Sequence, residues 1–188
     1  SRVSYSPYFS VRRELRRNME ETLKIRVLTG KSLEAIEADD QGVRGKVGGE
    51  AIRAELLLAA IGRRPVTAEL NLVAAGVTTN KAGYIEVDEY GQTKAATIYA
   101  IGDVNGGPQL AHAATEQGLI VAGNAANKPR RKFNPLVPAC IFTAPEIGSV
   151  GLTEAQAKEK KIEIKTGKYM FSVLGRALAA GETVGFVK

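Results

Sequence analysis

The chain has 188 residues, 44% of them hydrophobic, and 26 basic against 20 acidic side chains give it a formal net charge of +6. This length and composition allow one or two domains with a real core, and no apolar run is long enough to span a bilayer. A single cysteine excludes an internal disulfide. We therefore expect a cytoplasmic protein that has no contact with membranes.

The positive charge raises a nucleic-acid alternative. Basic residues cluster at residues 12–17, 128–132 and 158–161. The first cluster flanks the apolar stripe of a predicted amphipathic helix, in which four residues recur every four positions: Val11, Leu15, Met19 and Leu23. No aromatic residues interleave with this cluster, as a base-stacking platform would require. We interpret the clusters as solvated faces and expect no nucleic-acid partner.

The elements after this helix predict one side of a layered α/β domain. Residues 25–28 predict a short strand, and residues 33–38 and 44–47 alternate about a turn and predict antiparallel strands. Residues 56–61 are continuously apolar, as expected of a strand that is buried on both faces, and residues 62–65 end it. Together these elements predict the back half of a Rossmann-like domain whose first βαβ unit is absent.

The middle of the chain predicts two further strands and a helix. The strands lie at residues 84–87 and 98–101, and the helix lies at residues 111–124. Gly118 and Gly123 lower the intrinsic helix propensity, which suggests that the helix packs closely against its neighbours at both positions.

A polar, proline-bounded segment at residues 128–135 is the best domain boundary in the chain. Beyond it, Cys140 lies in an apolar strand pattern and is expected to be buried and inert. Residues 153–156 have the spacing of a capping box and predict a helix that runs to about Lys161. Residues 162–172 and 184–187 predict strands of an antiparallel sheet.

Gly102 and Asp103 are the most informative pair of residues in the chain, because they follow the predicted strand at residues 98–101 directly. A glycine there lets a ligand approach the backbone, and the aspartate places a carboxylate at the carboxyl end of a strand, where open α/β sheets bind ligands. The free amides of the helix start near Leu110 can face an electron-rich group. The pattern therefore predicts a ligand site.

This tract resembles the second flavin-binding segment of the pyridine nucleotide-disulfide oxidoreductases, and that of the dihydrolipoamide dehydrogenase branch most closely. Further blocks match in family order. Residues 56–65 resemble the strand and Gly-Arg-x-Pro turn that end the NAD domain, and residues 83–90 resemble the connector to the flavin domain. Residues 137–153 resemble the start of the interface domain, and residues 171–177 with 185–188 resemble its next hairpin.

The resemblance implies parts of three domains and a fold class of α/β with α+β. Residues 1–66 would be the carboxy-terminal part of the NAD-binding domain, residues 67–136 the second segment of the FAD-binding domain, and residues 137–188 the amino-terminal part of an antiparallel-sheet dimerisation domain. The family's glycine-rich fingerprints, its redox-active Cys-x4-Cys and its carboxy-terminal His and Glu have no match here. We therefore expect an internal portion of a longer enzyme.

The resemblance also implies FAD and NAD as cofactors. Asp103 would bind the ribityl chain of FAD, and the amides at the helix start would face the flavin ring. His112 is expected to have a positional role, since the family's acid–base histidine lies in a later segment. Arg63 would either take part in the NAD site or fix the turn at the surface. The predicted cofactor contacts are Gly62, Gly102, Asp103, Gln109, Leu110, Ala111 and His112.

The function implied is the oxidation of dihydrolipoamide with NAD+ through FAD and a redox disulfide outside this chain. The partners implied are a second copy of the protein and the lipoyl-bearing components of a 2-oxo acid dehydrogenase or of the glycine-cleavage system. Another flavoprotein disulfide reductase, such as a mercuric reductase, and a soluble transhydrogenase are alternatives within the class. A non-catalytic binding or assembly module is an alternative of another class. No metal site is expected, because ligands at useful spacing are absent.

Overall fold

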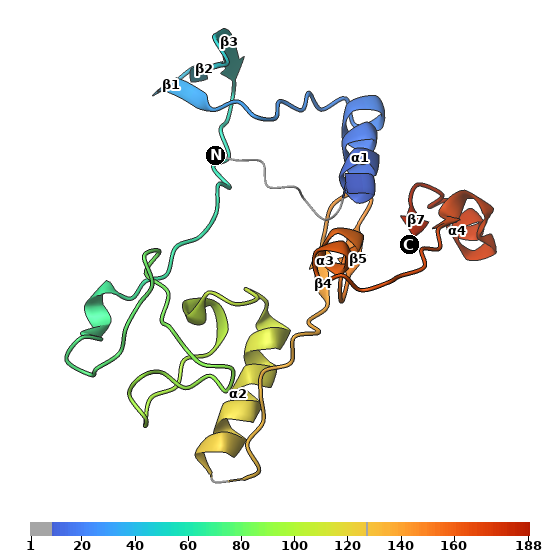
Figure 1. Cartoon of the computed structure of the whole chain (residues 1–188). Helices are drawn as coiled ribbons and strands as arrows, with labels where there is room; N and C mark the ends of the chain where they lie inside the picture. Colours follow the sequence, from blue (N-terminus) through green and yellow to red (C-terminus); the bar gives the residue numbers. More distant parts are fainter. Residues whose placement is uncertain (1–8, 127) are drawn as a thin grey trace. The chain divides into compact units, whose positions relative to one another are not determined.

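The computed structural model describes residues 9–126 and 128–188 (Figure 1). The chain forms two compact units. One consists of Ile61–Ala139 with Ser149–Gly151, and the other gathers the described residues before Ile61 with Cys140–Gly148 and Leu152–Lys188. The candidate site lies within the first of these, which we call the central unit.

The amphipathic helix predicted near the amino end is confirmed. It forms α1 (Phe9–Arg17) and continues as a π-helical turn over Asn18–Thr22. Three residues of the apolar stripe are half-buried, namely Val11, Leu15 and Met19, whereas Leu23 and the basic side chains of the first cluster are exposed to solvent. Arg16 pairs with Glu20 one turn later at 3.0 Å. This part of the basic sequence is therefore a solvated helix face, as predicted.

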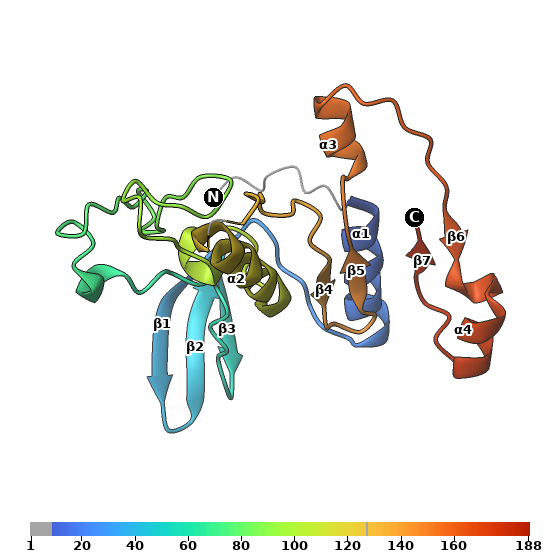
Figure 2. The same cartoon turned by 90° about the horizontal axis from the view of Figure 1, so that it is seen from below.

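The antiparallel strands predicted next are also confirmed, and a third strand joins them. β1 (Leu33–Asp39), β2 (Gly42–Val47) and β3 (Glu50–Ala54) form a sheet in that order (Figure 2). Both pairs are antiparallel. A strand needs only a short turn to pair with its neighbour in such a meander, which is why local sequence predicted the first pair correctly.

The predicted strands at residues 25–28 and 56–61 are wrong, since both segments are irregular. The side chains of Leu58 and Ile61 are 87% and 99% exposed. A strand of a parallel sheet is held by hydrogen bonds to strands that are distant in the chain. Neither segment belongs to a strand in the part of the chain that the structure describes, so the apolar run stays in solvent.

The central unit has a small core beneath a turn-rich connector. The strands predicted at residues 84–87 and 98–101 are reduced to two isolated antiparallel bridges, Thr79 with Ile85 and Gln92 with Tyr99. The connector is held by turns and by side-chain caps rather than by a ladder, which is why the strand prediction fails here. The core consists of Val77, Ile85 and Ala100, with Leu72, Val87, Ala95, Ile98 and Val104 packed around them.

The predicted central helix is confirmed as α2 (Ala111–Ala125) (Figure 1). Its buried residues recur at helical spacing along one face: Ala113, Gln117, Ile120 and Asn124. A side-chain Cβ at Gly118 would lie 3.4 Å from Cδ1 of Ile101, so close packing is confirmed there. At Gly123 a Cβ would meet open space, and the packing predicted for that glycine is wrong.

The last fifty residues contain short elements. β4 (Ala139–Ile141) pairs with β5 (Ile147–Ser149), and β6 (Tyr169–Met170) pairs with β7 (Phe186–Val187). The strands predicted at residues 162–172 and 184–187 are thus correct only over two residues each. A helix that the sequence did not predict, α4 (Gly175–Ala180), lies between them.

The capping box is confirmed, whereas the burial of the single cysteine is not. The Thr153 hydroxyl accepts a hydrogen bond from the Gln156 amide, and the Gln156 side chain accepts one from the Thr153 amide at 3.0 Å. These bonds start α3 (Glu154–Glu159). Cys140 is exposed, because β4 pairs with one other strand in the described residues and its sheet leaves the thiol in solvent.

We expect the chain of 188 residues to associate rather than to remain a clean monomer. Large apolar side chains lie in solvent, among them Leu56 at 87%, Phe142 at 85% and Val187 at 61% exposure. Exposed apolar surface and open strand edges favour pairing with another chain. Light scattering across a dilution series should show oligomers or aggregates. A monodisperse monomer that unfolds cooperatively would contradict this expectation.

Candidate functional site

Gly102 and Asp103 open a short 3-10 helix, Gly102–Asn105, immediately after an extended residue. Gly102 is buried and has a φ of +72°, in the left-handed region that favours glycine. A Cβ at this position would lie 3.2 Å from the Cβ of Ala114 on α2. Backbone conformation and close packing both require a glycine here, and the chain therefore turns tightly before it presents Asp103.

A buried glutamine on α2 fixes this turn. Gln117 Oε1 accepts hydrogen bonds from the Gly102 amide at 2.8 Å and from Asn105 Nδ2 at 3.1 Å. Asn105 Nδ2 also donates to the Ala100 carbonyl at 3.2 Å. Gln117 was not predicted as a site residue. Its position on the apolar face of α2 is the signal that could have found it, because a buried amide needs partners.

Replacing Gln117 by leucine should destabilise the chain by about 1 to 3 kcal/mol, because a buried amide and a side-chain donor would lose their acceptor. Gln117→Glu should lose less, since it keeps an oxygen at the same distance from the backbone. Thr115→Leu, on the exposed face of the same helix, is the matched control. Urea unfolding followed by circular dichroism measures the difference, and equal midpoints for Gln117→Leu and the control would contradict this role.

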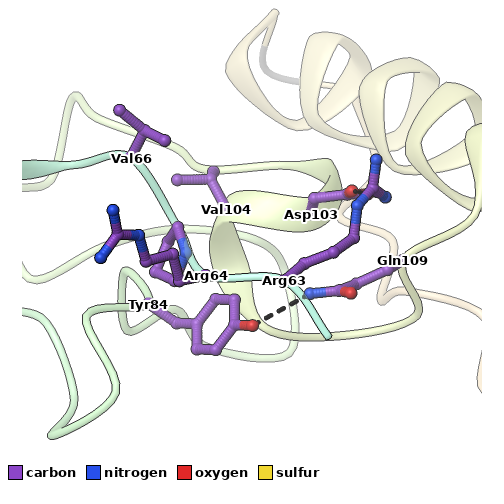
Figure 3. Close-up of a pocket in the computed structure, with 8 residues that line it drawn as sticks. Arg63, Arg64, Val66, Tyr84, Asp103, Val104 and Gln109 are labelled. Carbon is purple, nitrogen blue, oxygen red and sulfur yellow. Dashed lines mark hydrogen bonds and ion pairs between the residues drawn. The ribbon is translucent and has the colours of Figure 1, made fainter. Parts of the chain in front are cut away.

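Asp103 lies at the edge of a pocket of about 300 Å³ within the central unit (Figure 3). Asp103 Oδ2 pairs with Arg63 Nη1 at 2.9 Å, and both side chains are more than half exposed. On another wall, Gln109 Nε2 donates to the Tyr84 hydroxyl at 3.0 Å. The pocket is lined by Arg63, Arg64, Pro65, Val66, Tyr84, Asp103, Val104 and Gln109.

The remaining predicted site residues lie outside this lining. Leu110 is the N-cap of α2, and no side chain caps the first amides of the helix. Ala111 and His112 begin α2 and are exposed. His112 Nε2 lies 2.8 Å from the Pro138 carbonyl oxygen. A carbonyl only accepts, so Nε2 carries the proton in this contact.

Gly62 has a φ of +127°, is exposed, and does not line the pocket. The structure thus brings Asp103 and Gln109 to one pocket, whereas Gly102 is buried next to Asp103 and does not line it. Tyr84 was not predicted as part of a site, and the contact between Arg63 and Asp103 was not predicted either. Arg63 and Asp103 are 40 residues apart, and no local pattern signals such a contact.

The pocket fits part of a dinucleotide cofactor. Asp103 Oδ1 has no hydrogen bond among the described residues, so it can accept one from a polyol hydroxyl such as those of a ribityl chain. The uncapped first turn of α2 does not line the pocket, but it begins two residues after the lining residue Gln109 and offers backbone N–H groups and the positive end of a helix dipole. A volume of about 300 Å³ is at the small end for ligand pockets and admits one portion of such a molecule.

Two family profiles define the class of this protein. Residues 7–118 match the pyridine nucleotide-disulphide oxidoreductase profile, and residues 137–188 match the dimerisation domain of the same proteins. These are FAD-binding, NAD(P)-dependent oxidoreductases. The chain belongs to the pyridine nucleotide-disulphide oxidoreductase family.

Several relatives are similar over most of the chain. The identity is 40% over 156 residues to dihydrolipoyl dehydrogenase 3 of Haloarcula marismortui, covering 83% of this chain and 32% of that protein. The identity is 41% over 169 residues to the mercuric reductase of Bacillus cereus, covering 87% of this chain and 27% of that protein. The HOCl-induced flavoprotein disulfide reductase RclA of Escherichia coli superposes with a TM-score of 0.81 at 28% identity, covering 92% of this chain and 41% of RclA. The chain therefore spans less than half the length of these relatives.

The comparisons confirm the resemblance and the mixture of helices with antiparallel sheets. The three-domain division and the cofactor contacts stay predictions. Among the residues that the structure describes, no helix is long and apolar enough to cross a membrane.

Proposed function

We propose that the chain is part of a flavoprotein that oxidises dihydrolipoamide with NAD+, through FAD and a redox disulfide outside these residues. The observation that carries the proposal is the similarity to dihydrolipoyl dehydrogenases, at about 40% identity over most of the chain. The Gly102–Asp103 turn before α2 lies inside the matched region and carries an exposed carboxylate that can accept hydrogen bonds from a polyol.

In this proposal, Asp103 binds the ribityl chain of FAD by accepting hydrogen bonds from its hydroxyls. The first amides of α2, at Ala111 and His112, face the electron-rich edge of the flavin ring. The positive end of the helix dipole then stabilises the negative charge of the reduced state, by roughly 0.3 to 1 kcal/mol. The chemistry that FAD supplies when bound is two-electron transfer between a dithiol and a nicotinamide. Gln109 lines the pocket beside Asp103, and Gly62 lies at the mouth of the NAD site.

His112 has a positional role in the proposal. Its donation from Nε2 to the Pro138 carbonyl links the first turn of α2 to the segment after residue 135. A side chain used in this way orients the helix start rather than transferring protons to a substrate. The acid–base histidine of the reaction then comes from outside these residues.

The proposal extends to domains and partners. Residues 1–66, 67–136 and 137–188 would be parts of the NAD-binding, FAD-binding and dimerisation domains. The match of the last segment to a dimerisation domain supports a homodimer. Lipoyl-bearing components of a 2-oxo acid dehydrogenase or of the glycine-cleavage system would be the other partners, in the cytoplasm.

The second candidate is another flavoprotein disulfide reductase, and the mercuric reductase at 41% identity supports it. The whole protein distinguishes the two when it is assayed with dihydrolipoamide and NAD+, and with Hg2+ and NADPH. Turnover in the first assay alone supports the proposal, and turnover in the second alone overturns it. Hydride exchange between nucleotides without a disulfide would indicate a transhydrogenase. A protein without flavin would indicate a non-catalytic module.

A further inference from the structure

The ion pair between Arg63 and Asp103 joins two segments that are 40 residues apart in the chain. Arg63 lies in the irregular segment that follows the apolar run at residues 56–61, and Asp103 lies in the 3-10 helix that Gly102 opens. Their closest atoms, Nη1 and Oδ2, are 2.9 Å apart. No other hydrogen bond holds the Asp103 carboxylate among the described residues, so Arg63 alone restricts the direction in which it points.

The pair adds little to folding stability. The side chains of Arg63 and Asp103 are 70% and 51% exposed. Exposed ion pairs gain little, because water screens the attraction and two long side chains lose rotamer freedom. The effect of the contact is therefore to select one orientation of the carboxylate at the pocket wall.

The neighbouring arginine provides an internal comparison. Arg64 lines the same pocket but extends away from Asp103 (Figure 3). It forms no ion pair within the described part of the chain. Two adjacent guanidinium groups thus share one pocket and one local sequence, and only Arg63 contacts the carboxylate.

We propose that Arg63 is a positioning residue for cofactor binding. It holds Asp103 Oδ2 and leaves Oδ1 to accept a hydrogen bond from a hydroxyl of the bound cofactor. This inference rests on the proposed function, since it takes FAD as the ligand of the pocket. When a ligand covers the pocket and removes water, an unpaired carboxylate becomes costly, and its attraction to the guanidinium strengthens. The contact with Arg63 therefore stabilises the protein with bound FAD more than the protein without FAD.

The test measures release of FAD from the whole protein, followed by the rise in flavin fluorescence after dilution. Arg63→Ala should release FAD roughly five- to tenfold faster, as expected for the loss of a charge-assisted contact. Arg63→Lys should release FAD more slowly than Arg63→Ala, because it keeps the positive charge but lacks the planar guanidinium group. Arg64→Ala is the matched control and should release FAD at nearly the rate of the unmodified protein.

A double variant separates positioning from a general structural effect. If Arg63 acts through Asp103, the double variant Arg63→Ala with Asp103→Ala should release FAD no faster than Asp103→Ala alone. Additive effects, or an Arg63→Ala variant that behaves like Arg64→Ala, would overturn the inference. If Arg63→Ala does not fold, Arg63→Gln replaces it, both alone and in the double variant with Asp103→Ala.

The inference and the proposed function fail in different ways. If the unmodified whole protein contains no FAD, the proposed function is wrong, and the inference is wrong with it. If the protein contains FAD and turns over dihydrolipoamide but the Arg63 variants retain FAD like the control, only the inference is wrong.

Discussion

The isolated chain of 188 residues should show no dihydrolipoamide-dependent reduction of NAD+. The reaction in the proposed enzyme needs two cysteines that exchange with the substrate and a general acid–base, whereas this sequence contains one cysteine and one histidine. A single thiol cannot form the internal disulfide, so Cys140 does not replace it. His112 Nε2 already forms a hydrogen bond with the Pro138 carbonyl oxygen. Loss of a general acid–base alone costs about 10² to 10⁴ in rate, and loss of the redox disulfide removes the reaction path.

The measurement is NADH formation by the purified chain with excess dihydrolipoamide, with and without added FAD. The whole protein, assayed under the same conditions, is the control. Turnover by the chain above the rate of a protein-free sample would contradict the expectation that the redox disulfide and the acid–base histidine lie outside these residues.

The isolated chain should also fail to hold FAD stoichiometrically. The pocket of about 300 Å³ admits only part of a dinucleotide. The pyrophosphate of such cofactors binds at the glycine-rich turn of a βαβ unit, and this sequence has no such fingerprint. Gel filtration with excess FAD should therefore give a protein peak with little flavin.

Substitution of Asp103 in the whole protein should have the largest effect of any single change in the described site. Asp103→Ala removes the acceptor of a charge-assisted hydrogen bond and should weaken FAD binding by about 1.5 to 3 kcal/mol. That loss corresponds to roughly a 10- to 150-fold rise in the dissociation constant. Asp103→Asn should lose less of the free energy of FAD binding, since one acceptor oxygen remains. Titration of the apoprotein with FAD, followed by flavin fluorescence, gives the constants.

An exposed acid in the β1–β2 turn serves as the matched control. Asp40 is exposed, and Asp40→Ala should bind FAD as the unmodified protein does. If Asp103→Ala and Asp103→Asn both bind FAD as firmly as the Asp40 variant, Asp103 is not a cofactor ligand.

The sequence by itself determined those elements whose hydrogen bonds close within a few residues. The α2 helix, the Thr153 capping box and the β1–β2 pair all appear where the patterns placed them. In each case the donor and acceptor are near in the chain, so apolar periodicity and cap chemistry are sufficient signals. Gly102 was predicted as a position where a ligand can approach the backbone, whereas its left-handed φ of +72° and its packing against Ala114 are seen only in the structure.

Only the tertiary structure decided the features that depend on distant partners. The run at residues 56–61 reads as a buried strand, yet it is irregular and exposed, because a strand forms only where another strand accepts its hydrogen bonds. The acceptor role of Gln117 toward Gly102 and the pairing of Arg63 with Asp103 likewise join residues 15 and 40 positions apart. Periodicity and motif spacing carry no information about such pairs, since the folded backbone alone determines which side chains meet.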